Sequence, residues 1–154
     1  MTKTAYFVLR AFFILLLLTT ALGKLLDNRG FAAVIDTYQF GIPEPLLLPL
    51  ALGVSLFELG LASSIILGAY LRQCAILTIL MHLGYTLMAI ITNFRGIEIL
   101  NCGCFGVFLA RPMTWFTVVE DLILTALSVA FYLAIIRYQR NPQPQLKNLH
   151  SKAS

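Results

Sequence analysis

The fold is decided by Leu46–Tyr70, LLLPLALGVSLFELGLASSIILGAY, a stretch that is apolar apart from a single charged residue, Glu58. About 20 mostly apolar residues are needed to cross the ~30 Å hydrocarbon layer of a bilayer. This segment is long enough to do so. Because an isolated span cannot leave its backbone groups unpaired in lipid, we predict that it forms a transmembrane helix.

Three further segments have the same character. They are Tyr6–Gly23, Ala75–Asn93 and Met113–Ile136. In the first of them the only charge is Arg10, whose side chain can reach the interface while its stem stays in lipid. The fold class predicted is therefore all-α, a four-transmembrane-helix bundle over residues 1–137.

The composition supports a membrane protein of one domain. The chain has 154 residues, of which 59% are hydrophobic and 12% charged, and its mean hydropathy is +0.85. A soluble domain carries about 25% charged residues, so this chain lacks the polar surface that a soluble globule needs. The same figures exclude a disordered chain. The net charge of +4 is scattered between apolar blocks, which indicates a lipid bilayer as partner and no nucleic acid.

Two segments lie outside the four spans. Between the first two spans, Lys24–Pro45 contains apolar residues at helical spacing, so we predict a short interfacial helix there. The apolar positions are Phe31, Val34, Ile35 and Tyr38. At the other end, residues 138–154 are polar and contain prolines, and we expect a disordered cytoplasmic tail.

The first span has a second interpretation. Lys3 and Arg10, an apolar centre and the small residues around Ala21 and Gly23 also resemble a signal peptide with its cleavage site. The apolar stretch is longer than a usual signal-peptide core once residues 6–9 are included. We therefore favour a retained helix, with the cleaved signal peptide as the alternative.

The basic residues predict the orientation, because cytoplasmic loops carry an excess of Lys and Arg. Seven basic residues fall on the side of the two termini: Lys3, Arg10, Arg72, Arg137, Arg140, Lys147 and Lys152. Four fall on the opposite side: Lys24, Arg29, Arg95 and Arg111. We expect a multi-pass protein of the inner (cytoplasmic) membrane with both termini cytoplasmic and the loop before the last span in the periplasm or outside the cell.

Two of the three cysteines lie in that loop. Cys102 and Cys104 flank Gly103, and on the oxidising side of a membrane such a pair tends to oxidise. A Cys-x-Cys disulfide closes a very small, strained ring, and strained disulfides are labile and easily exchanged. We predict a thiol–disulfide exchange pair. Cys74, at the other end of the third span, is interpreted as a small buried apolar residue.

Two other roles remain open for the cysteine pair. It could supply half of a metal site, but structural zinc takes four ligands. His82 is expected in the middle of the membrane and Cys74 at its opposite face, so neither completes such a site. We therefore predict no metal. Alternatively, each cysteine could form a static bridge to a partner protein.

Polar residues inside the spans form stripes on two predicted helices. The third span carries Thr78, His82, Tyr85, Ala89 and Asn93 at intervals of three and four, and the fourth carries Thr114, Thr117, Asp121, Thr125, Ser128 and Tyr132. Such intervals mark one helix face, so the stripes should face each other or a shared cavity. Ionisable groups in spans usually point into the bundle.

These buried groups allow a structural and a functional interpretation. In the structural one, Lys24, Glu58 and Asp121 form a buried ion pair or network. In the functional one, His82, Tyr85 and Asp121 line a quinone headgroup site or a proton path. Glu120 is expected to belong to a helix contact or to pair with Arg111 or Lys24. In the second span Gly53, Gly60, Ser64 and Gly68 suggest close helix packing.

Several of these residues together resemble a known family. The elements are GKLLD at Gly23–Asp27, the Gly30-Phe31-Ala32 string followed by Tyr38, Glu58 in the second span, and NCGCFG at Asn101–Gly106 before the last span. They resemble the MauE/DoxX family of small four-helix membrane proteins. The likeness extends over most of residues 1–137, and Cys-Gly-Cys-Phe-Gly is its most specific part.

The resemblance implies a role in redox processes outside the cytoplasm. The MauE branch is associated with maturation of methylamine dehydrogenase, whose disulfide-rich small subunit is built with a thioredoxin-like partner. Carried over to this sequence, Cys102 and Cys104 become the exchange pair. Lys24, Asp27 and Glu58 become the family's polar core.

Three functions follow as hypotheses. The first is thiol–disulfide exchange through Cys102 and Cys104 with a thioredoxin-like protein or a maturing client such as an amine dehydrogenase subunit, with quinone as a candidate cofactor. The second is a non-catalytic membrane subunit or assembly factor of a larger complex. The third is a DoxX/DoxD-like subunit of a thiosulfate:quinone oxidoreductase, which would depend on His82 and Asp121 more than on the cysteines.

Overall fold

The computed structural model of the protein describes residues 3–140. Over that range the chain forms five helices and no strand: α1 (Lys3–Leu26), α2 (Asn28–Thr37), α3 (Glu44–Leu67), α4 (Leu71–Phe94) and α5 (Trp115–Arg140). By length and composition, α1, α3, α4 and α5 can each cross a membrane. The predicted all-α bundle with four spans is confirmed, and α2 is the short helix expected between the first two.

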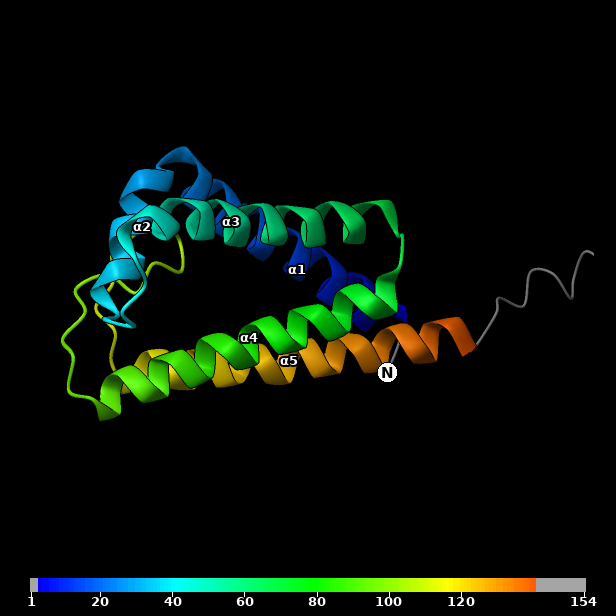
Figure 1. The fold of residues 1–154 in the computed structure, drawn as a ribbon. Coiled ribbons are helices and arrows are strands. Elements are labelled where there is room, and N and C mark those ends of the chain that lie inside the picture. Colours follow the sequence, from blue (N-terminus) through cyan, green and yellow to red (C-terminus); the bar gives the residue numbers. More distant parts are fainter. Residues whose placement is uncertain (1–2, 141–154) are drawn as a thin grey trace, which may run out of the picture.

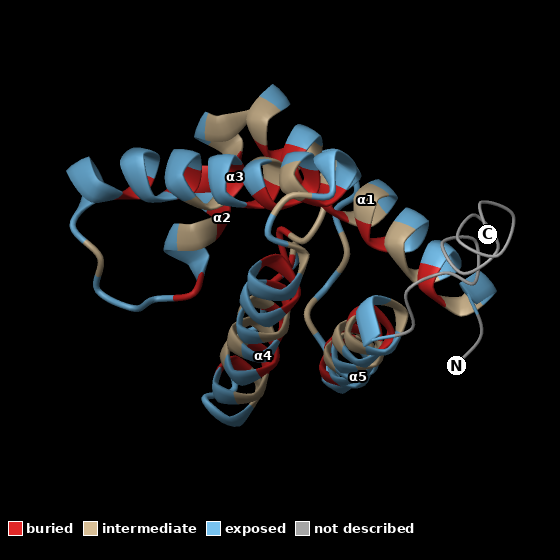
Figure 2. Cartoon of the chain, turned by 90° about the vertical axis from the view of Figure 1, so that its right-hand side faces the viewer, coloured by how far each residue is buried: buried red, intermediate tan, exposed pale blue. Residues whose placement is uncertain are grey.

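The four long helices are arranged in two layers (Figures 1 and 2). α1 packs along α3, and α4 packs along α5. The start of α1, the turn between α3 and α4 and the end of α5 lie at one end of the bundle, which we call the terminal end. α2 and the α4–α5 loop, residues 95–114, lie at the opposite end, which we call the loop end.

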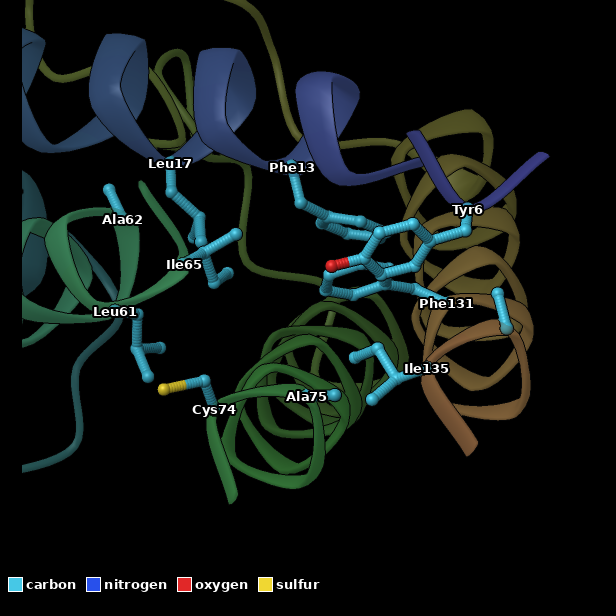
Figure 3. Close-up of a cluster of buried hydrophobic side chains, with 11 residues drawn as sticks. Tyr6, Phe13, Leu17, Leu61, Ala62, Ile65, Cys74, Ala75, Phe131 and Ile135 are labelled. Carbon is cyan, nitrogen blue, oxygen red and sulfur yellow. The ribbon is translucent and has the colours of Figure 1, made fainter. Parts of the chain in front are cut away.

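At the terminal end the layers are joined by buried apolar side chains from α1, α3, α4 and α5 (Figure 3). The rings of Phe13 and Phe131 stack with centroids 5.3 Å apart, and those of Tyr6 and Tyr138 stack at 4.3 Å. Cys74 is buried in the same cluster, which agrees with its predicted role as a small buried apolar residue.

The end of α3 is completed by a basic side chain from α1. Arg10 donates hydrogen bonds to the carbonyl oxygens of Ile65, at 2.8 Å, and Ile66, at 3.0 Å. These are among the last carbonyls of α3, which have no partner inside the helix. Gly68 then ends α3 with a φ of 73°, in the left-handed region that favours glycine.

One expectation about α3 was wrong. Gly53 and Gly60 do not mediate close helix packing, because a Cβ atom on either would meet nothing within 4 Å, and both residues are exposed. The buried face of α3 instead carries Ala51, Ser55 and Glu58. Small residues fit a lipid-facing surface as readily as a helix contact, so their spacing alone did not identify the packed face.

The predicted boundary at residue 137 falls inside α5, which continues to Arg140. The apolar pattern of the span fades there, but the helix goes on because nothing in Arg137–Arg140 breaks it. Most of the predicted tail, residues 141–154, lies outside the described residues.

Candidate functional site

The α4–α5 loop is folded onto itself by backbone hydrogen bonds. The Cys102 nitrogen donates to the Arg111 carbonyl at 2.8 Å, and the Met113 nitrogen donates to the Ile99 carbonyl at 2.9 Å. Inside this closed loop, the Asn101 side chain accepts from the Gly103 nitrogen at 2.9 Å. The cysteines are therefore held on an ordered turn.

Two glycines let this turn approach α1 and α2. Gly103 and Gly106 have φ angles of 73° and 69°, where most other residues are strained. A Cβ atom on Gly106 would collide with the backbone oxygen of Gly23 at the end of α1, and one on Gly23 would lie 2.5 Å from the Phe105 oxygen. Backbone therefore lies directly on backbone where the loop meets α1.

The structure brings the two predicted exchange cysteines together. The Sγ atoms of Cys102 and Cys104 are 3.0 Å apart, and both thiols are free. Cys102 is buried while Cys104 is partly exposed. The hydroxyl of Tyr38, from the end of α2, donates to the Cys102 carbonyl at 2.7 Å, which fixes the backbone of the pair against that helix.

The two thiols differ in acidity. The pKa of Cys102 is lowered to about 6, mainly because its thiolate accepts a hydrogen bond from the Cys104 thiol, with a smaller contribution from the positive charge of Arg111. The pKa of Cys104 is raised, because its proton is held in that bond and because partial removal from water disfavours its thiolate. Cys102 is thus the thiolate of the pair near neutral pH, and the thiolate is the reactive form.

A buried ion pair lies beneath the loop. Lys24 Nζ and Glu58 Oε1 are 2.5 Å apart, and the two side chains are 3% and 1% exposed. The Tyr85 hydroxyl donates to the same Glu58 oxygen at 2.7 Å. The Lys24 ammonium also lies 5.4 Å and 5.3 Å from the ring centroids of Phe31 and Tyr85. The second oxygen of Glu58, Oε2, has no hydrogen-bond partner.

Neither Asp27 of the predicted polar core nor Asp121 joins the Lys24–Glu58 ion pair. Asp27 is a helix cap, because its carboxylate accepts from the Gly30 nitrogen at 2.9 Å at the start of α2. Asp121 is buried, but it belongs to neither ion pair found in residues 3–140, which are Lys24–Glu58 and Arg111–Glu120. Glu120 therefore pairs with Arg111 and not with Lys24.

The polar stripes of α4 and α5 face each other, as their spacing predicted. His82 Nδ1 lies 2.9 Å from the Thr78 carbonyl oxygen and 3.2 Å from Ser128 Oγ on α5. One turn further along, the hydroxyls of Thr86 and Thr125 are 3.4 Å apart. Sequence analysis missed Thr86, although it lies four residues after His82 and so on the same helix face.

Two cavities meet at the cysteine pair. The larger, about 380 Å³, lies among α1, α4 and α5, and the smaller, about 220 Å³, lies beneath α2 and the loop. Four residues line both: Lys24, Tyr85, Cys104 and Asp121. His82 and Glu58 line only the larger, and Cys102 only the smaller. The candidate site therefore comprises a thiol pair, a buried ion pair and two adjoining cavities.

Sequence analysis did not assign Arg111 or Tyr38 to the site. Tyr38 is 64 residues from its partner Cys102, and no local pattern could have linked them. Arg111 was considered only as a partner for Glu120. Its position next to the cysteines follows from the backbone hydrogen bond between Arg111 and Cys102, which the sequence does not show.

A family-wide sequence profile described as methylamine utilisation protein MauE matches residues 2–135. This chain belongs to the MauE family. The resemblance to MauE noted from the sequence is confirmed.

Two MauE relatives show how far the likeness extends. The chain is 29% identical over 122 residues to methylamine utilization protein MauE of Paracoccus denitrificans, covering 79% of this chain and 65% of that protein. It is 30% identical over 128 residues to MauE of Methylorubrum extorquens, covering 82% and 68%. The aligned part is thus about two thirds of either relative. No solved structure matches this MauE-family chain.

Proposed function

We propose that this MauE-family membrane protein supports disulfide formation in an extracytoplasmic client by thiol–disulfide exchange through Cys102 and Cys104. The observation that carries the proposal is the 3.0 Å approach of the two Sγ atoms in an ordered loop where Cys102 has a pKa of about 6. Because the relatives are named for methylamine utilisation, the client we favour is an amine dehydrogenase subunit.

The exchange starts from the disulfide form of the pair. A client thiolate attacks Cys104 Sγ, since Cys104 is the more exposed of the two. Cys102 leaves as a thiolate, and its low pKa makes it the better leaving group. A second client thiolate then attacks the client sulfur of the mixed disulfide, the client S–S bond forms, and Cys104 leaves.

Electrons and protons balance in this reaction. The client loses two electrons and two protons as its disulfide forms. The pair gains the two electrons as its own S–S bond breaks. Cys104 takes one proton, and the other goes to solvent because Cys102 stays ionised above about pH 6. The product is the reduced pair described above, and hydrogen bonding between its thiols favours that reduced state.

The partner must reach the loop end of the bundle. The bias of basic residues toward the side of the termini supports an extracytoplasmic loop end, with the protein in the inner membrane. A thioredoxin-like protein or the client itself fits there, because the partly exposed Cys104 is the sulfur it would meet.

The proposal can be tested by trapping mixed disulfides between this protein and its partner in membranes. In the reverse exchange, Cys104 attacks the disulfide of an oxidised client and Cys102 resolves the mixed disulfide. Cys102→Ser removes this resolving thiolate, so we expect the variant to accumulate a covalent partner that reductant releases. Cys74→Ser is the matched control and should trap nothing, because Cys74 is buried in the terminal-end cluster. If neither Cys102→Ser nor Cys104→Ser traps a partner, exchange is refuted.

The alternative is a non-catalytic assembly subunit. The backbone contact between the loop and Gly23 favours it, since a rigid docking surface needs the same support. A redox titration separates the two functions. Full client maturation by the Cys102→Ser/Cys104→Ser double variant would establish the assembly role.

A further inference from the structure

The larger cavity reaches the apolar surface of the bundle. Phe12 of α1 and Ile123 of α5 line it, yet they are 38% and 55% exposed. On helices that span a membrane, exposed apolar side chains face lipid. A molecule dissolved in the bilayer can therefore enter this cavity between α1 and α5, and the volume of about 380 Å³ lies within the ~300–1,000 Å³ of small-molecule pockets.

The cavity also contains a polar atom without a partner. Glu58 lines it and is 1% exposed, and its Oε2 atom accepts no hydrogen bond. Leaving a buried acceptor unsatisfied is costly, so this oxygen fits a ligand that donates a hydrogen bond. Lys24 lines the same cavity, and its ammonium group has three N–H donors, so those not directed at Glu58 fit a ligand's acceptor.

We propose that this cavity binds an isoprenoid quinone, which is the electron acceptor that reoxidises Cys102 and Cys104. A quinone has an apolar body soluble in lipid and two carbonyl oxygens, and its reduced form has two hydroxyl donors. Cys104 lines the cavity, so the pair can pass electrons to a ring bound there. The inference rests on the proposed function and names the acceptor for the same thiol pair.

The step is balanced. Cys102 and Cys104 form their S–S bond and give up two electrons. One proton comes from the Cys104 thiol and one from water, since Cys102 is already ionised. The quinone is reduced to quinol by these two electrons and two protons, and a quinol hydroxyl can then donate to Glu58 Oε2. Exchange with a client returns the pair to its dithiol form, which completes a cycle.

The smaller cavity fits this ligand less well. Its volume of about 220 Å³ is below the usual range for small-molecule pockets, ~300–1,000 Å³. Glu58 does not line it, and its walls are mostly apolar side chains such as Phe31, Ile42 and Met88. The unpartnered carboxylate oxygen of Glu58 therefore favours the larger cavity as the quinone site.

The test uses the full chain in lipid nanodiscs, without oxygen, and a short-chain ubiquinone as probe. Two readouts are taken: quinol formation with loss of free Cys102 and Cys104 thiols, and exchange of the pair with glutathione disulfide in the absence of quinone. Leu124→Trp fills the cavity, because Leu124 lines it. Leu133→Trp is the control on the same helix, because Leu133 is exposed and lines neither cavity.

We expect Leu124→Trp to reduce the apparent affinity for quinone by about tenfold, a loss of ~1.4 kcal/mol, with exchange to glutathione disulfide retained. Leu133→Trp should match the unmodified protein in its apparent affinity for quinone and in its exchange with glutathione disulfide. If the unmodified protein exchanges with glutathione disulfide but forms no quinol, or if both Trp variants reduce quinone equally well, the quinone site is refuted and the exchange function stands. If exchange itself is missing, the proposed function fails.

Discussion

The two ends of this bundle are held together by different forces. At the terminal end, apolar and aromatic side chains such as Phe13, Ile65 and Phe131 fill the space between the layers. At the loop end, the contacts are the buried Lys24–Glu58 pair and hydrogen bonds and backbone contacts around the glycines. The two cavities adjoin at this end, and the larger one extends along the bundle as far as Leu17 of the terminal-end cluster.

The apolar terminal end thus mainly stabilises the bundle, whereas the polar loop end holds the groups that can react. Close apolar packing leaves no room for a ligand and offers no group that reacts. A polar cluster with cavities packs less fully, but it places an acidic thiol next to a space that a ligand can enter. The substitutions below test this division, in order of decreasing effect.

Removing one member of the buried ion pair should have the largest effect. Lys24→Met leaves Glu58 charged and without its counter-ion, which costs about 3–5 kcal/mol. We expect a matching loss in the free energy of unfolding, measured by detergent-induced unfolding in mixed micelles. The double variant Lys24→Met/Glu58→Met should recover most of it, because both charges are then gone. A double variant as unstable as the single one would contradict a charge effect.

Opening a void at the terminal end should cost somewhat less. Phe131→Ala removes a fully buried ring that stacks on Phe13. Because lipid is as apolar as the core, the substitution removes mainly packing contacts. We therefore expect the free energy of unfolding to fall by about 2–3 kcal/mol, which is at or below the lower end of the range for such truncations. Alkylation of Cys102 should keep its pH dependence, and a changed pH dependence would show that the two ends are not separate.

The contact between loop and α1 can be tested with two glycines of equal φ. Gly106 and Gly41 both have a φ of 69°, but a Cβ atom meets the Gly23 backbone at Gly106 and nothing within 4 Å at Gly41. Alanine in the left-handed region costs about 1–2 kcal/mol at either site. Only Gly106→Ala should also displace the loop and speed maleimide labelling of Cys104. Equal labelling rates in the two variants would argue against the contact.

A smaller effect is expected on the acidity of one thiol. The rate of Cys102 alkylation by iodoacetamide should rise with pH through a midpoint near 6, because the thiolate is the nucleophile. Cys104→Ala removes the main cause of this low pKa, so the midpoint should move up toward the ordinary thiol range. A midpoint that stays near 6 in this variant would exclude the hydrogen bond as its cause.

The smallest effect should come from Arg111. Its ion pair with Glu120 is partly exposed, with side chains 42% and 31% accessible, and such pairs contribute about 0–1 kcal/mol. Arg111→Gln should barely change the unfolding free energy. It should raise the pKa of Cys102 less than Cys104→Ala does, as the same alkylation profile would show. A larger rise would make the positive charge the dominant cause.

Much of the fold could be predicted from the sequence. The four spans and the short helix follow from apolar runs and helical spacing, because lipid requires each span to satisfy its own backbone. The facing stripes on α4 and α5 were predicted because intervals of three and four mark one helix face and polar groups in spans point into the bundle. Gly53 and Gly60 were assigned wrongly, because the exposed and packed faces of an apolar helix have similar compositions.

The candidate site was only partly predictable. Cys102 and Cys104 stood out by their spacing, and Lys24 and Glu58 by their charge in an apolar setting. Asp27 was grouped with them by resemblance alone, whereas its position three residues before Gly30 already matched a helix cap. Tyr38 and Arg111 could not be assigned, since their contacts with Cys102 arise only when distant segments fold together.

Which segments enter the membrane and which residues can react follow from the amino-acid sequence, because both depend on the chemistry of single residues and short runs. Which of those residues meet depends on how the helices pack. Only packing α1, α2, α4 and the loop together brings Cys104 to the cavities shared with Lys24 and Tyr85. The pKa of a thiol, its exposure and its contacts all depend on the groups around it, and those groups come together only once the helices have packed.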